Sequence, residues 1–589
     1  MNIEEISPPN DPGLYRIRHS CAHLLAQAVR DYLADDGAAP VHFAIGPPIE
    51  NGFYYDFELP RPLTDKELPL IEERMRAFIG ADLTFVKRVV SREEAQALFA
   101  DQPFKLELID DIDGELSVYT QSPADFTDLC RGPHVESSSA IAADAFRLTS
   151  VSGAYWRGDE KRAHLQRIYG TAWRTSEELE RYLWQLAEAE RRDHRRLGKE
   201  LELFHFDPTA PGMPYWLPKG LKILNELIAF WRHEHEERGY LEIASPMLNR
   251  KELWVTSGHW DHYQDSMFLS PVDANTTYLV KPMNCPNAMI VFNLKLRSYK
   301  ELPLRLSDCD VLHRNERSGS LHGLFRVQKF QQDDAHIFLR PDQLADEFDR
   351  ILDLADHFYR IFGLKYTYRL GTRPADFMGD VESWDEAEAT LRRVLDKNVG
   401  PDLYLIAEGD GAFYGPKIDI LMEDGLGRRW QMGTLQLDFQ IPRRFGCSYA
   451  DQYGQAQTPV VIHRVIYGSL ERFIGILIEH TAGALPVWLS PVQARVISIS
   501  EKHAGYARIV RDHLHAAGIR VELDDGDTRM QARIRQAEVD KVPYIAVVGN
   551  REMTDDTVSL RLRSRKNLGS VSVPALIDQI KEAITSKAL

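Results

Sequence analysis

The sequence predicts a multidomain α+β protein. The chain has 589 residues, too many for one hydrophobic core and enough for roughly three to four domains of about 150 residues each. Three stretches differ in pattern: short helices mixed with strands in 11–172, long helices with β-rich runs in 205–488, and alternating strands and helices in 489–589. Residues 173–204 instead form one highly charged helical pattern, which predicts a linker helix between domains.

The predicted elements follow one another with recognisable boundaries. Thr175 and Glu178 have the spacing of a capping box, which indicates that the linker helix begins there. In the central region the clearest patterns are a helix over 221–238 and strands over 276–282 and 428–439. Towards the C-terminus the runs VQARVISIS, GIRVEL and YIAVVG are separated by helical patterns. They predict a small parallel or mixed sheet with helices on its faces.

Composition limits the class of protein. An apolar share of 44% and a charged share of 27% are ordinary for a globular protein, and no run of about 18 apolar residues indicates a membrane span. The N-terminal stretch MNIEEISPPNDPG lacks the pattern of a secretion signal. Five widely spaced cysteines fit a reducing compartment better than a disulfide framework. We therefore expect a cytoplasmic protein with no membrane partner.

The net charge of −17 does not decide whether the protein binds nucleic acid, because binding depends on local patches. Two basic clusters stand out: Arg191, Arg192, Arg195 and Arg196 in the linker, and Arg561, Arg563, Arg565 and Lys566 near the C-terminus. From charge alone, the simpler interpretation of each cluster is a solvated surface.

The central region lacks the common glycine-rich phosphate loops, GxxxxGK[ST] and GxGxxG after a strand. It contains instead the segments HRNE with Arg314 and Glu316, LFRV with Arg326, and GSLERF with Arg472. Arginine can clamp phosphate oxygens with two hydrogen bonds and can stack on adenine, and a carboxylate can accept a hydrogen bond from the adenine amino group. An arginine beside a glutamate on a strand is more commonly a surface ion pair, so only the combination of segments favours an ATP site.

Together with KGLKILNELIAFWRHEHEERGYLEIASP, which ends at Pro246, the HRNE and GSLERF segments resemble the three signature motifs of class II aminoacyl-tRNA synthetases. The class I signatures HIGH and KMSKS are absent. The resemblance implies an antiparallel catalytic sheet flanked by helices, a homodimer interface built by the first motif, and ATP bound with Mg²⁺. The ATP-binding residues that it implies are Arg314 at the α-phosphate, Glu316 and Arg472 at the adenine, Arg326 at the ATP tail, and Gln431.

Cys285, His336 and His463 are too far apart in the sequence for any metal-ligand spacing rule, and each alone is more commonly a core residue. Their segments KPMNCP, QQDDAH and VIHR nevertheless resemble the three zinc-bearing segments of threonyl-tRNA synthetases. The resemblance implies one catalytic Zn²⁺ with open coordination positions that L-threonine fills with its amino and hydroxyl groups, whereas valine has no hydroxyl. The threonine pocket that it implies consists of Met283, Gln332, Asp334, Tyr414, Lys417 and Gln436.

A second Cys/His pattern lies near the N-terminus, in His19-Ser-Cys-Ala-His23 and Cys130-Arg-Gly-Pro-His134. If each pair is helical, its residues face one way and the four can converge. They fit a zinc site, a metal-free hydrolytic pocket or buried structural histidines. With the later SGAYWRGD, they resemble the editing domain of bacterial threonyl-tRNA synthetases and of alanyl-type editing proteins. The resemblance implies hydrolysis of seryl-tRNA(Thr), since zinc cannot exclude serine, in a pocket that we expect to be metal-free. The implied editing residues are His19, His23, Lys105, Asp128, Cys130 and His134.

The last hundred residues resemble the α/β anticodon-binding domain shared by several class II synthetases, which implies tRNA(Thr) as a partner. Glu552 and Arg561 match positions expected to contact anticodon bases, and the basic cluster 561–566 is expected to contact phosphates. The predicted domains are an editing domain (11–172), a linker helix (173–204), a class II catalytic domain (205–488) and an anticodon-binding domain (489–589).

The match departs from the family pattern in a few places. It begins near Arg18, so we expect the small ubiquitin-like domain that commonly precedes this point to be missing. Asn287-Ala288 replace a common Gly-His, and Gln328-Lys329 replace a common Arg-Gly or Arg-Ser, which suggests a second, inhibitor-tolerant copy. The alternatives are a prolyl or seryl synthetase, a regulatory RNA-binding paralogue, or a trans-acting editing factor. The Cys/His/His set and the retained arginines argue against them.

Overall fold

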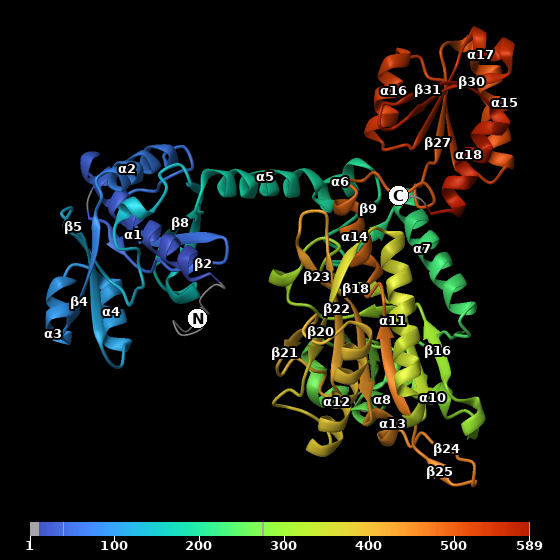
Figure 1. Cartoon of the computed structure of the whole chain (residues 1–589), viewed down its shortest axis with the longest axis horizontal. Helices are drawn as coiled ribbons and strands as arrows, with labels where there is room; N and C mark the ends of the chain where they lie inside the picture. Colours follow the sequence, from blue (N-terminus) through green and yellow to red (C-terminus); the bar gives the residue numbers. More distant parts are fainter. Residues whose placement is uncertain (1–10, 39, 274–275, 588–589) are drawn as a thin grey trace. The chain divides into compact units, whose positions relative to one another are not determined.

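The computed structural model describes residues 11–38, 40–273 and 276–587, and its chain divides into two compact units (Figure 1). Unit 1 comprises Met1–Ala187 and unit 2 comprises Glu188–Leu589. The division falls inside the predicted linker 173–204. Among the described residues, none of the helices combines the length and apolar character needed to cross a membrane.

Unit 1 is an α+β domain in which helix α1 packs against an antiparallel sheet of order β1-β3-β8-β7, with β2 paired to β3, and a second sheet has the order β4-β5-β6. Asp11 starts α1 by accepting hydrogen bonds from the backbone of Gly13 and Leu14, and Pro12 occupies the first turn. The elements are α1 (Pro12–Asp35), β1 (His42–Phe43), β2 (Pro48–Ile49), β3 (Gly52–Glu58), α2 (Leu68–Gly80), β4 (Thr84–Val90), α3 (Arg92–Leu98), α4 (Pro103–Asp111), β5 (Leu116–Ser122), β6 (Phe126–Leu129), β7 (Phe146–Tyr155) and β8 (His164–Ala172).

The predicted single linker helix is two helices, α5 (Ser176–Arg192) and α6 (His194–Glu200). Asp193 interrupts them, since its φ of −47° and ψ of 120° are not helical and its side chain accepts the backbone N–H of Arg195. The capping box is half formed. Thr175 Oγ1 accepts from the Glu178 N–H at 3.3 Å, but the Glu178 carboxylate accepts from the backbone of Arg174 rather than of Thr175. The prediction of one continuous helix was therefore wrong, because Asp193 is a helix start that periodicity alone did not reveal.

The centre of unit 2 is an eight-stranded sheet of order β11-β16-β19-β26-β23-β22-β20-β21, antiparallel except at its two edge pairs. Its strands are β11 (Leu241–Glu242), β16 (Leu304–Asp308), β19 (Asp334–Leu339), β20 (Lys365–Gly371), β21 (Leu405–Ala407), β22 (Lys417–Glu423), β23 (Arg429–Asp438) and β26 (Val460–Val465). One face carries the helices α7 (Pro218–Glu236), α11 (Leu344–Ile361), α12 (Val381–Asn398) and α14 (Leu470–His480). The predicted helix 221–238 and the strand 428–439 correspond to α7 and β23.

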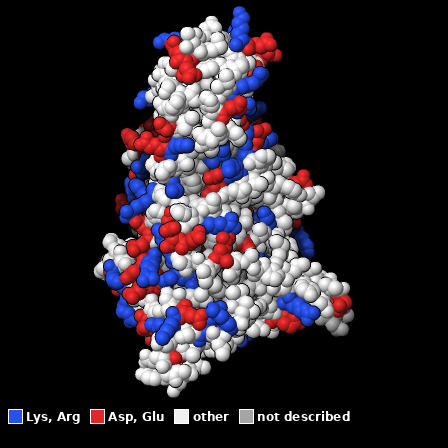
Figure 2. Space-filling model, turned by 90° about the vertical axis from the view of Figure 1, so that its right-hand side faces the viewer, with Lys and Arg blue, Asp and Glu red and all other residues white. Residues whose placement is uncertain are grey.

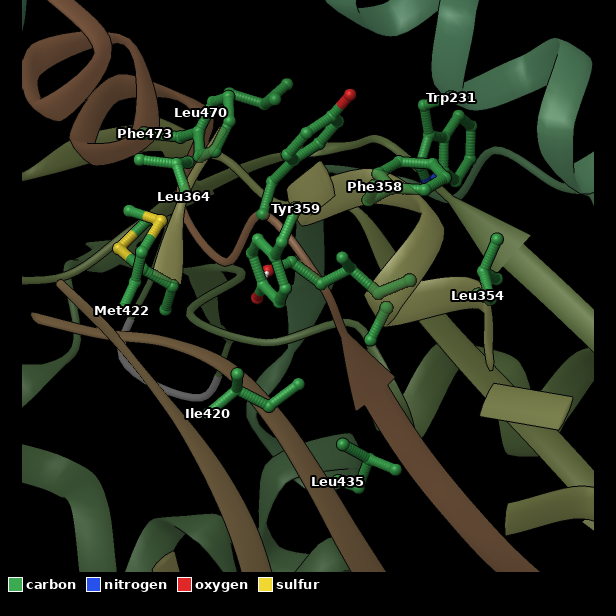
Figure 3. Close-up of a cluster of buried hydrophobic side chains, with 14 of the residues drawn as sticks. Trp231, Leu354, Phe358, Tyr359, Leu364, Ile420, Met422, Leu435, Leu470 and Phe473 are labelled. Atoms are coloured by element: carbon green, nitrogen blue, oxygen red, sulfur yellow. Dashed lines mark hydrogen bonds between the residues drawn. The ribbon is translucent and has the colours of Figure 1, made fainter. Parts of the chain in front are cut away.

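The core on this helical face holds large buried side chains, among them Trp231 of α7, Tyr359 of α11, Ile420 of β22 and Phe473 of α14 (Figure 3). Fully burying one such side chain contributes about 1.5–3 kcal/mol. The hydroxyl of Tyr359 donates to the Ile466 carbonyl at 2.6 Å, so its polar end is also satisfied. This face is therefore a structural core, which leaves the opposite face of the same strands for chemistry.

The opposite face of the sheet holds a smaller cluster formed with α10 (Cys285–Phe292) and α13 (Ile441–Arg444). Strand alternation decides which residues lie there. In β19 the side chains of Ala335, Ile337 and Leu339 pack into the large core, so His336 and Phe338 face α10. In β26 the same rule turns Val461 and His463 to this side.

Short elements complete this part of unit 2. They are β9 (Phe204–His205), β10 (Tyr215–Trp216), β12 (Leu248–Arg250), α8 (Lys251–Ser257), α9 (His259–Tyr263), β13 (Leu269–Pro271), β14 (Thr277–Val280), β15 (Arg297–Ser298), β17 (Val311–His313), β18 (Lys329–Gln331), β24 (Tyr449–Ala450) and β25 (Ala456–Gln457). Strands β9 and β10 lie beside the large core. Strand β14 lies within the stretch 276–282 predicted as β-rich. The loop that carries Arg314, Glu316 and Arg326 lies between the antiparallel strands β17 and β18.

The C-terminal part of unit 2 is a mixed sheet of order β28-β27-β29-β30-β31, parallel among its first three strands and antiparallel after them. Its elements are β27 (Ala494–Ser498), α15 (Ala504–Ala516), β28 (Val521–Asp524), α16 (Met530–Val539), β29 (Tyr544–Val548), α17 (Asn550–Asp555), β30 (Thr557–Leu562), β31 (Asn567–Ser572) and α18 (Val573–Thr585). Of the two sheet types left open by the sequence, the mixed one is present.

Candidate active site

The second face of the core sheet opens into a cavity of about 600 Å³. The predicted residues that line it are Met283, Cys285, Arg314, Glu316, Arg326, Gln332, Asp334, His336, Tyr414, Gln431, Gln436, His463 and Arg472. These residues come from segments far apart in the sequence, and the sheet and its surrounding loops bring them to one place. Of the residues predicted for ATP, zinc and threonine, only Lys417 is not among those that line the cavity.

Cys285, His336 and His463 form a buried cluster at one end of this cavity, with ligand atoms all within 4.8 Å of one another. His336 and His463 are register partners on adjacent strands, and Cys285 begins helix α10. Burial lowers the pKa of His336 to about 4 and raises that of the Cys285 thiol well above its usual value. His336 Nδ1 has no hydrogen-bond partner among the described residues, as expected for a nitrogen that awaits a ligand.

The donor set of this cluster fits zinc. One sulfur and two imidazole nitrogens are typical of a catalytic zinc site that keeps an open position. His463 Nε2 lies 2.8 Å from the Asp438 carboxylate, which leaves Nδ1 of this ring as the nitrogen with a free lone pair. A carboxylate–histidine arrangement of this kind orients metal ligands in many proteins.

Three arginines converge on the same cavity. Burial lowers the pKa of Arg472, and the nearby charges of Arg326 and Arg314 lower it further, which indicates crowding of like charges. Glu316 offsets part of this charge through an ion pair with Arg326 at 2.9 Å. The sequence interpretation placed Arg314 and Glu316 on a strand, but β17 ends at His313 and both residues lie in the loop after it. A concentration of guanidinium groups in a half-enclosed cavity favours a polyanionic ligand.

The residues expected for threonine surround the Cys/His cluster. The Tyr414 ring lies 5.1 Å from that of His463, and its hydroxyl donates to Gln436 Oε1. Asp334 is buried and accepts a hydrogen bond from the Asn284 amide at 3.3 Å. These groups supply carboxylate and amide acceptors beside the place where a metal fits.

Lys417 forms ion pairs with Asp410 and Asp419, each at 3.2 Å from its ammonium nitrogen. Asp419 is fully buried and also accepts from the Gln431 amide at 2.7 Å. Sequence reasoning missed Asp419, because nothing in its local pattern marks a carboxylate inside a β-strand as an orienting group.

His259 is a second residue that sequence reasoning missed. It is fully buried, its Nε2 lies 3.6 Å from Cys285 Sγ, and its Nδ1 lies 2.7 Å from Ser257 Oγ. A single histidine in the segment SGHW carries no spacing signal, and only the folded chain brings it to Cys285.

In unit 1 the four residues of the N-terminal pattern also converge, with ligand atoms of His19, His23, Cys130 and His134 within 4.8 Å of one another. His19 and His23 share one face of α1, as predicted. Cys130 and His134 lie instead in the loop after β6, so helical spacing does not account for their place in the cluster. They converge because the loop folds back over α1.

The donor atoms of Cys130, His19 and His134 all have partners, whereas His23 Nδ1 has none among the described residues. Cys130 Sγ lies 3.3 Å from both His19 Nε2 and His134 Nε2. His19 Nδ1 lies 3.1 Å from the Pro133 carbonyl, and His134 Nδ1 lies 3.1 Å from Ser20 Oγ. Burial lowers the pKa of His19 to about 3 and that of His23 to about 4, and it raises the Cys130 pKa to about 12. The histidines are therefore neutral and the thiol protonated at pH 7.

A cavity of about 310 Å³ in unit 1 is lined by His19, His23 and Cys130 of the tetrad and by Lys105 and Asp128. Lys105 and Asp128 are buried and form an ion pair of 2.5 Å. Burial opposes ionisation of Asp128, but the charges of Lys105 and His23 and hydrogen bonds from Lys105 and Tyr55 outweigh it, so the pKa is lowered. A charged pair beside neutral imidazoles suits a pocket for a polar, cationic substrate group.

Every arginine of the first basic cluster has an acidic partner. Arg191 and Arg192 pair with Glu188, Arg195 pairs with Asp193 between the two helices, and Arg196 pairs with Glu200. Arg563 donates to the Leu485 carbonyl, and the exposed Arg565 pairs with Glu538. On the face drawn in Figure 2, acidic and basic side chains are interspersed.

Of the two residues predicted for the anticodon, Glu552 accepts a hydrogen bond from the Gly549 backbone at 3.0 Å at the start of α17. Arg561 lies on β30, opposite Ile545 of β29, and its side chain forms no hydrogen bond or ion pair with the described part of the chain.

Comparison with known proteins agrees with this geometry. Residues 268–481 match the class II core domain of tRNA synthetases for G, H, P, S and T, and residues 493–583 match an anticodon-binding domain. Residues 116–169 match the second additional domain of threonyl and alanyl tRNA synthetases. The antiparallel core sheet with its arginine-lined cavity thus belongs to a class II aminoacyl-tRNA synthetase.

Curated relatives specify the family. The threonine–tRNA ligase of Caldanaerobacter subterraneus is 49% identical over 100% of this chain and 90% of its own length, and that of Desulforamulus reducens is 46% identical over 100% and 91%. A solved RNA-binding domain of threonyl-tRNA synthetase from Cryptosporidium parvum is 42% identical, with a TM-score of 0.64. The matched region covers 66% of this chain and 98% of that one. The chain belongs to the threonyl-tRNA synthetase family. The expected class II core, editing-related domain and anticodon-binding domain are confirmed.

Proposed function

We propose that the chain joins L-threonine to tRNA(Thr) through a threonyl-adenylate, reads threonine with a zinc ion, and hydrolyses seryl-tRNA(Thr) in unit 1. The observation that carries the proposal is that three arginines and the Cys285/His336/His463 cluster line one cavity. A polyanion site and a metal-ligand set in the same cavity match the two substrates of amino-acid activation.

ATP binds with Mg²⁺ at the arginine end of the cavity. Arg314 neutralises the α-phosphate, Arg326 the phosphate tail, and Glu316, Gln431 and Arg472 hold the adenine. One carboxylate oxygen of threonine then attacks the α-phosphorus, a new P–O bond forms, the α–β bridging P–O bond breaks, and pyrophosphate leaves. This step depends on positioning and charge neutralisation, which the converging guanidinium groups supply.

The other end of the cavity selects the amino acid. Cys285, His336 and His463 would hold Zn²⁺, which supplies a Lewis-acid position that distinguishes a hydroxyl from a methyl group. Asp334 lies where it accepts hydrogen bonds from the substrate ammonium, and Tyr414, Gln436, Gln332 and Met283 shape the pocket. In the second step a terminal hydroxyl of tRNA attacks the threonyl carbonyl, the threonyl ester forms, and AMP leaves.

Unit 1 would correct serine errors. The neutral imidazoles of His19 and His23 can accept a proton from water as it attacks the seryl ester, which releases serine and free tRNA. Lys105 and Asp128 position the seryl group. The partners of Cys130, His19 and His134 within unit 1 support a metal-free pocket, and His23 Nδ1, which has no hydrogen-bond partner among the described residues, is the nitrogen open to water.

The remaining expectations belong to this proposal. The catalytic domain spans 205–488, and the editing domain (11–172) and anticodon-binding domain (489–589) flank it along the chain, with Glu552 and Arg561 at the anticodon. A homodimer forms through the first motif, whose strand β11 is an edge strand with Leu241 55% exposed. The enzyme works in the cytoplasm.

ATP–pyrophosphate exchange with threonine, serine and valine tests the activation step. We expect exchange with threonine, weaker exchange with serine and none with valine. A folded, zinc-loaded protein that exchanges with no amino acid would overturn the proposal and favour a regulatory paralogue.

A further inference from the structure

His194, the first residue of α6, makes an unusual set of buried contacts at the edge of the arginine-lined cavity. Its side chain is fully buried. Its backbone N–H donates to Glu479 Oε1 at 3.0 Å, and its Nδ1 lies 2.7 Å from the same oxygen. Its Nε2 accepts a hydrogen bond from the backbone N–H of Leu324 at 2.9 Å. One imidazole thus connects helix α6, helix α14 and the LFRV segment.

These contacts determine the tautomer of His194. A nitrogen that accepts from a backbone N–H carries no proton, so Nε2 is unprotonated and Nδ1 bears the hydrogen. Nδ1–H then donates to Glu479, whose other carboxylate oxygen pairs with Arg428. Because the Leu324 N–H is buried, removal of the imidazole leaves it without an acceptor.

The segment 323–326 that His194 holds carries part of the ATP site. The Phe325 carbonyl accepts from Arg472 Nε at 2.8 Å, and Arg326 pairs with Glu316. The Phe325 ring lies 4.1 Å from the His194 ring and 4.4 Å from that of Trp430. A displacement of this short segment therefore moves the cavity wall and two of its arginines together.

The packing leaves little room for an alternative arrangement. Gly323 has a positive φ of +50°, and a Cβ there would lie 2.2 Å from His194 Nε2. On the other side, a Cβ on Gly475 of α14 would lie 3.0 Å from the Phe325 ring. Two glycines thus allow the backbone to approach the imidazole and the helix closely, as a fixed position of the segment requires.

We propose that His194 and Glu479 form a positioning pair for the ATP site, which holds the segment 323–326 against α14 so that Phe325, Arg326 and Arg472 keep their places. The pair touches neither the zinc ligands nor the threonine residues, so it acts on ATP binding alone. This inference rests on the proposed function, since it assigns a cause to the geometry of the same ATP site.

The test compares KM values for ATP and for threonine in the ATP–pyrophosphate exchange reaction of the full chain. His194→Ala should raise the KM for ATP about tenfold, the order expected from loss of one buried hydrogen bond, and change the KM for threonine less than about twofold. His194→Gln should recover much of the loss, because its amide oxygen can accept from the Leu324 N–H. Arg196→Ala, an exposed neighbour on α6 that pairs only with Glu200, is the matched control and should behave as wild type.

Combining the two substitutions tests whether His194 and Glu479 act as a pair. If the two residues act together, Glu479→Ala and the double variant His194→Ala/Glu479→Ala should have similar KM values for ATP. Additive effects, or an equal rise in both substrates' KM values in His194→Gln, would overturn the inference. If His194→Ala does not fold, His194→Gln is used instead, and its change in the KM for ATP is compared with its change in the KM for threonine. A wild-type protein without exchange activity contradicts the proposed function instead, so the two failures are distinguishable.

Discussion

The two Cys/His clusters of this chain are built from similar residue types but differ in how their donor atoms are satisfied. In unit 1 the Cys130 sulfur lies 3.3 Å from two imidazoles, and the other nitrogens of those rings have a carbonyl and a hydroxyl as partners. In unit 2, His336 Nδ1 has no partner among the described residues, and the nearest hydrogen-bonding group to Cys285 Sγ is at 3.6 Å. His23 Nδ1 in unit 1 likewise has no hydrogen-bond partner among the described residues, so the two clusters differ in how many of their donor atoms already have partners.

This difference follows from where the ligands lie. His336 and His463 are register partners on adjacent strands, so the backbone hydrogen bonds of the sheet fix the separation of their Cα atoms. Cys130 and His134 lie in a loop, which can close over α1 until the donors bond to one another.

The largest effect should come from removing a zinc ligand. We expect Cys285→Ala to lose its zinc, measured by atomic absorption, and to lower threonine-dependent exchange by more than about 100-fold, since even outer-shell changes cost 10–100-fold. Cys130→Ala should keep one zinc per chain. Loss of zinc in both variants would show that the tetrad also holds metal and would break the comparison.

Removing a tetrad imidazole should affect editing only. His23→Ala is expected to slow deacylation of seryl-tRNA(Thr) about 10²-fold or more, the usual contribution of a general base, while threonine-dependent exchange stays at the wild-type rate. Deacylation and exchange rates are measured on the same preparation. A parallel fall in both would indicate that the two units do not act independently.

Removing the charge of Asp438, whose carboxylate contacts His463, should have an intermediate effect on zinc affinity. Asp438→Asn keeps a hydrogen-bonding group at 2.8 Å but removes its charge, so we expect zinc affinity to fall about 10- to 100-fold. Competition with a chelator measures the change. Ser20→Ala, which removes the partner of His134 in the other cluster, is the counterpart and should leave zinc affinity unchanged.

The smallest expected effect is a dependence of stability on pH. The folded-state pKa values of His19 and His23, about 3 and about 4, lie below the ordinary 6.5. Their contribution to stability is therefore complete above pH 6.5 and is lost as pH falls from 6.5 towards 4, because the unfolded chain binds more protons in that window. The slope is at most about 1.4 kcal/mol per pH unit for each histidine. Hydrogen exchange of α1 between pH 4.5 and 7 should show this slope, and His19→Gln should reduce it. A slope that changes when a chelator is added would contradict a metal-free tetrad.

Much of the architecture could be predicted from the sequence. Hydrophobic periodicity is a local property, so it indicated α7, β23 and the alternating C-terminal strands and helices close to their observed limits. Family motifs indicated Cys285, His336, His463 and the arginines because their segments are individually distinctive. Periodicity failed where a single residue overrode the pattern, as Asp193 does between α5 and α6.

The sequence by itself determined which residue types are available and which secondary structure carries them. Only the tertiary structure decided that β-strand alternation turns His336 and His463 to the α10 face, that Lys417 pairs with Asp419, and that Arg563 contacts a backbone carbonyl. It also brought His259 to Cys285 and His194 to Leu324, across 26 and 130 residues. Contacts at such separations depend on how sheets and helices pack, and no local pattern in the chain encodes them.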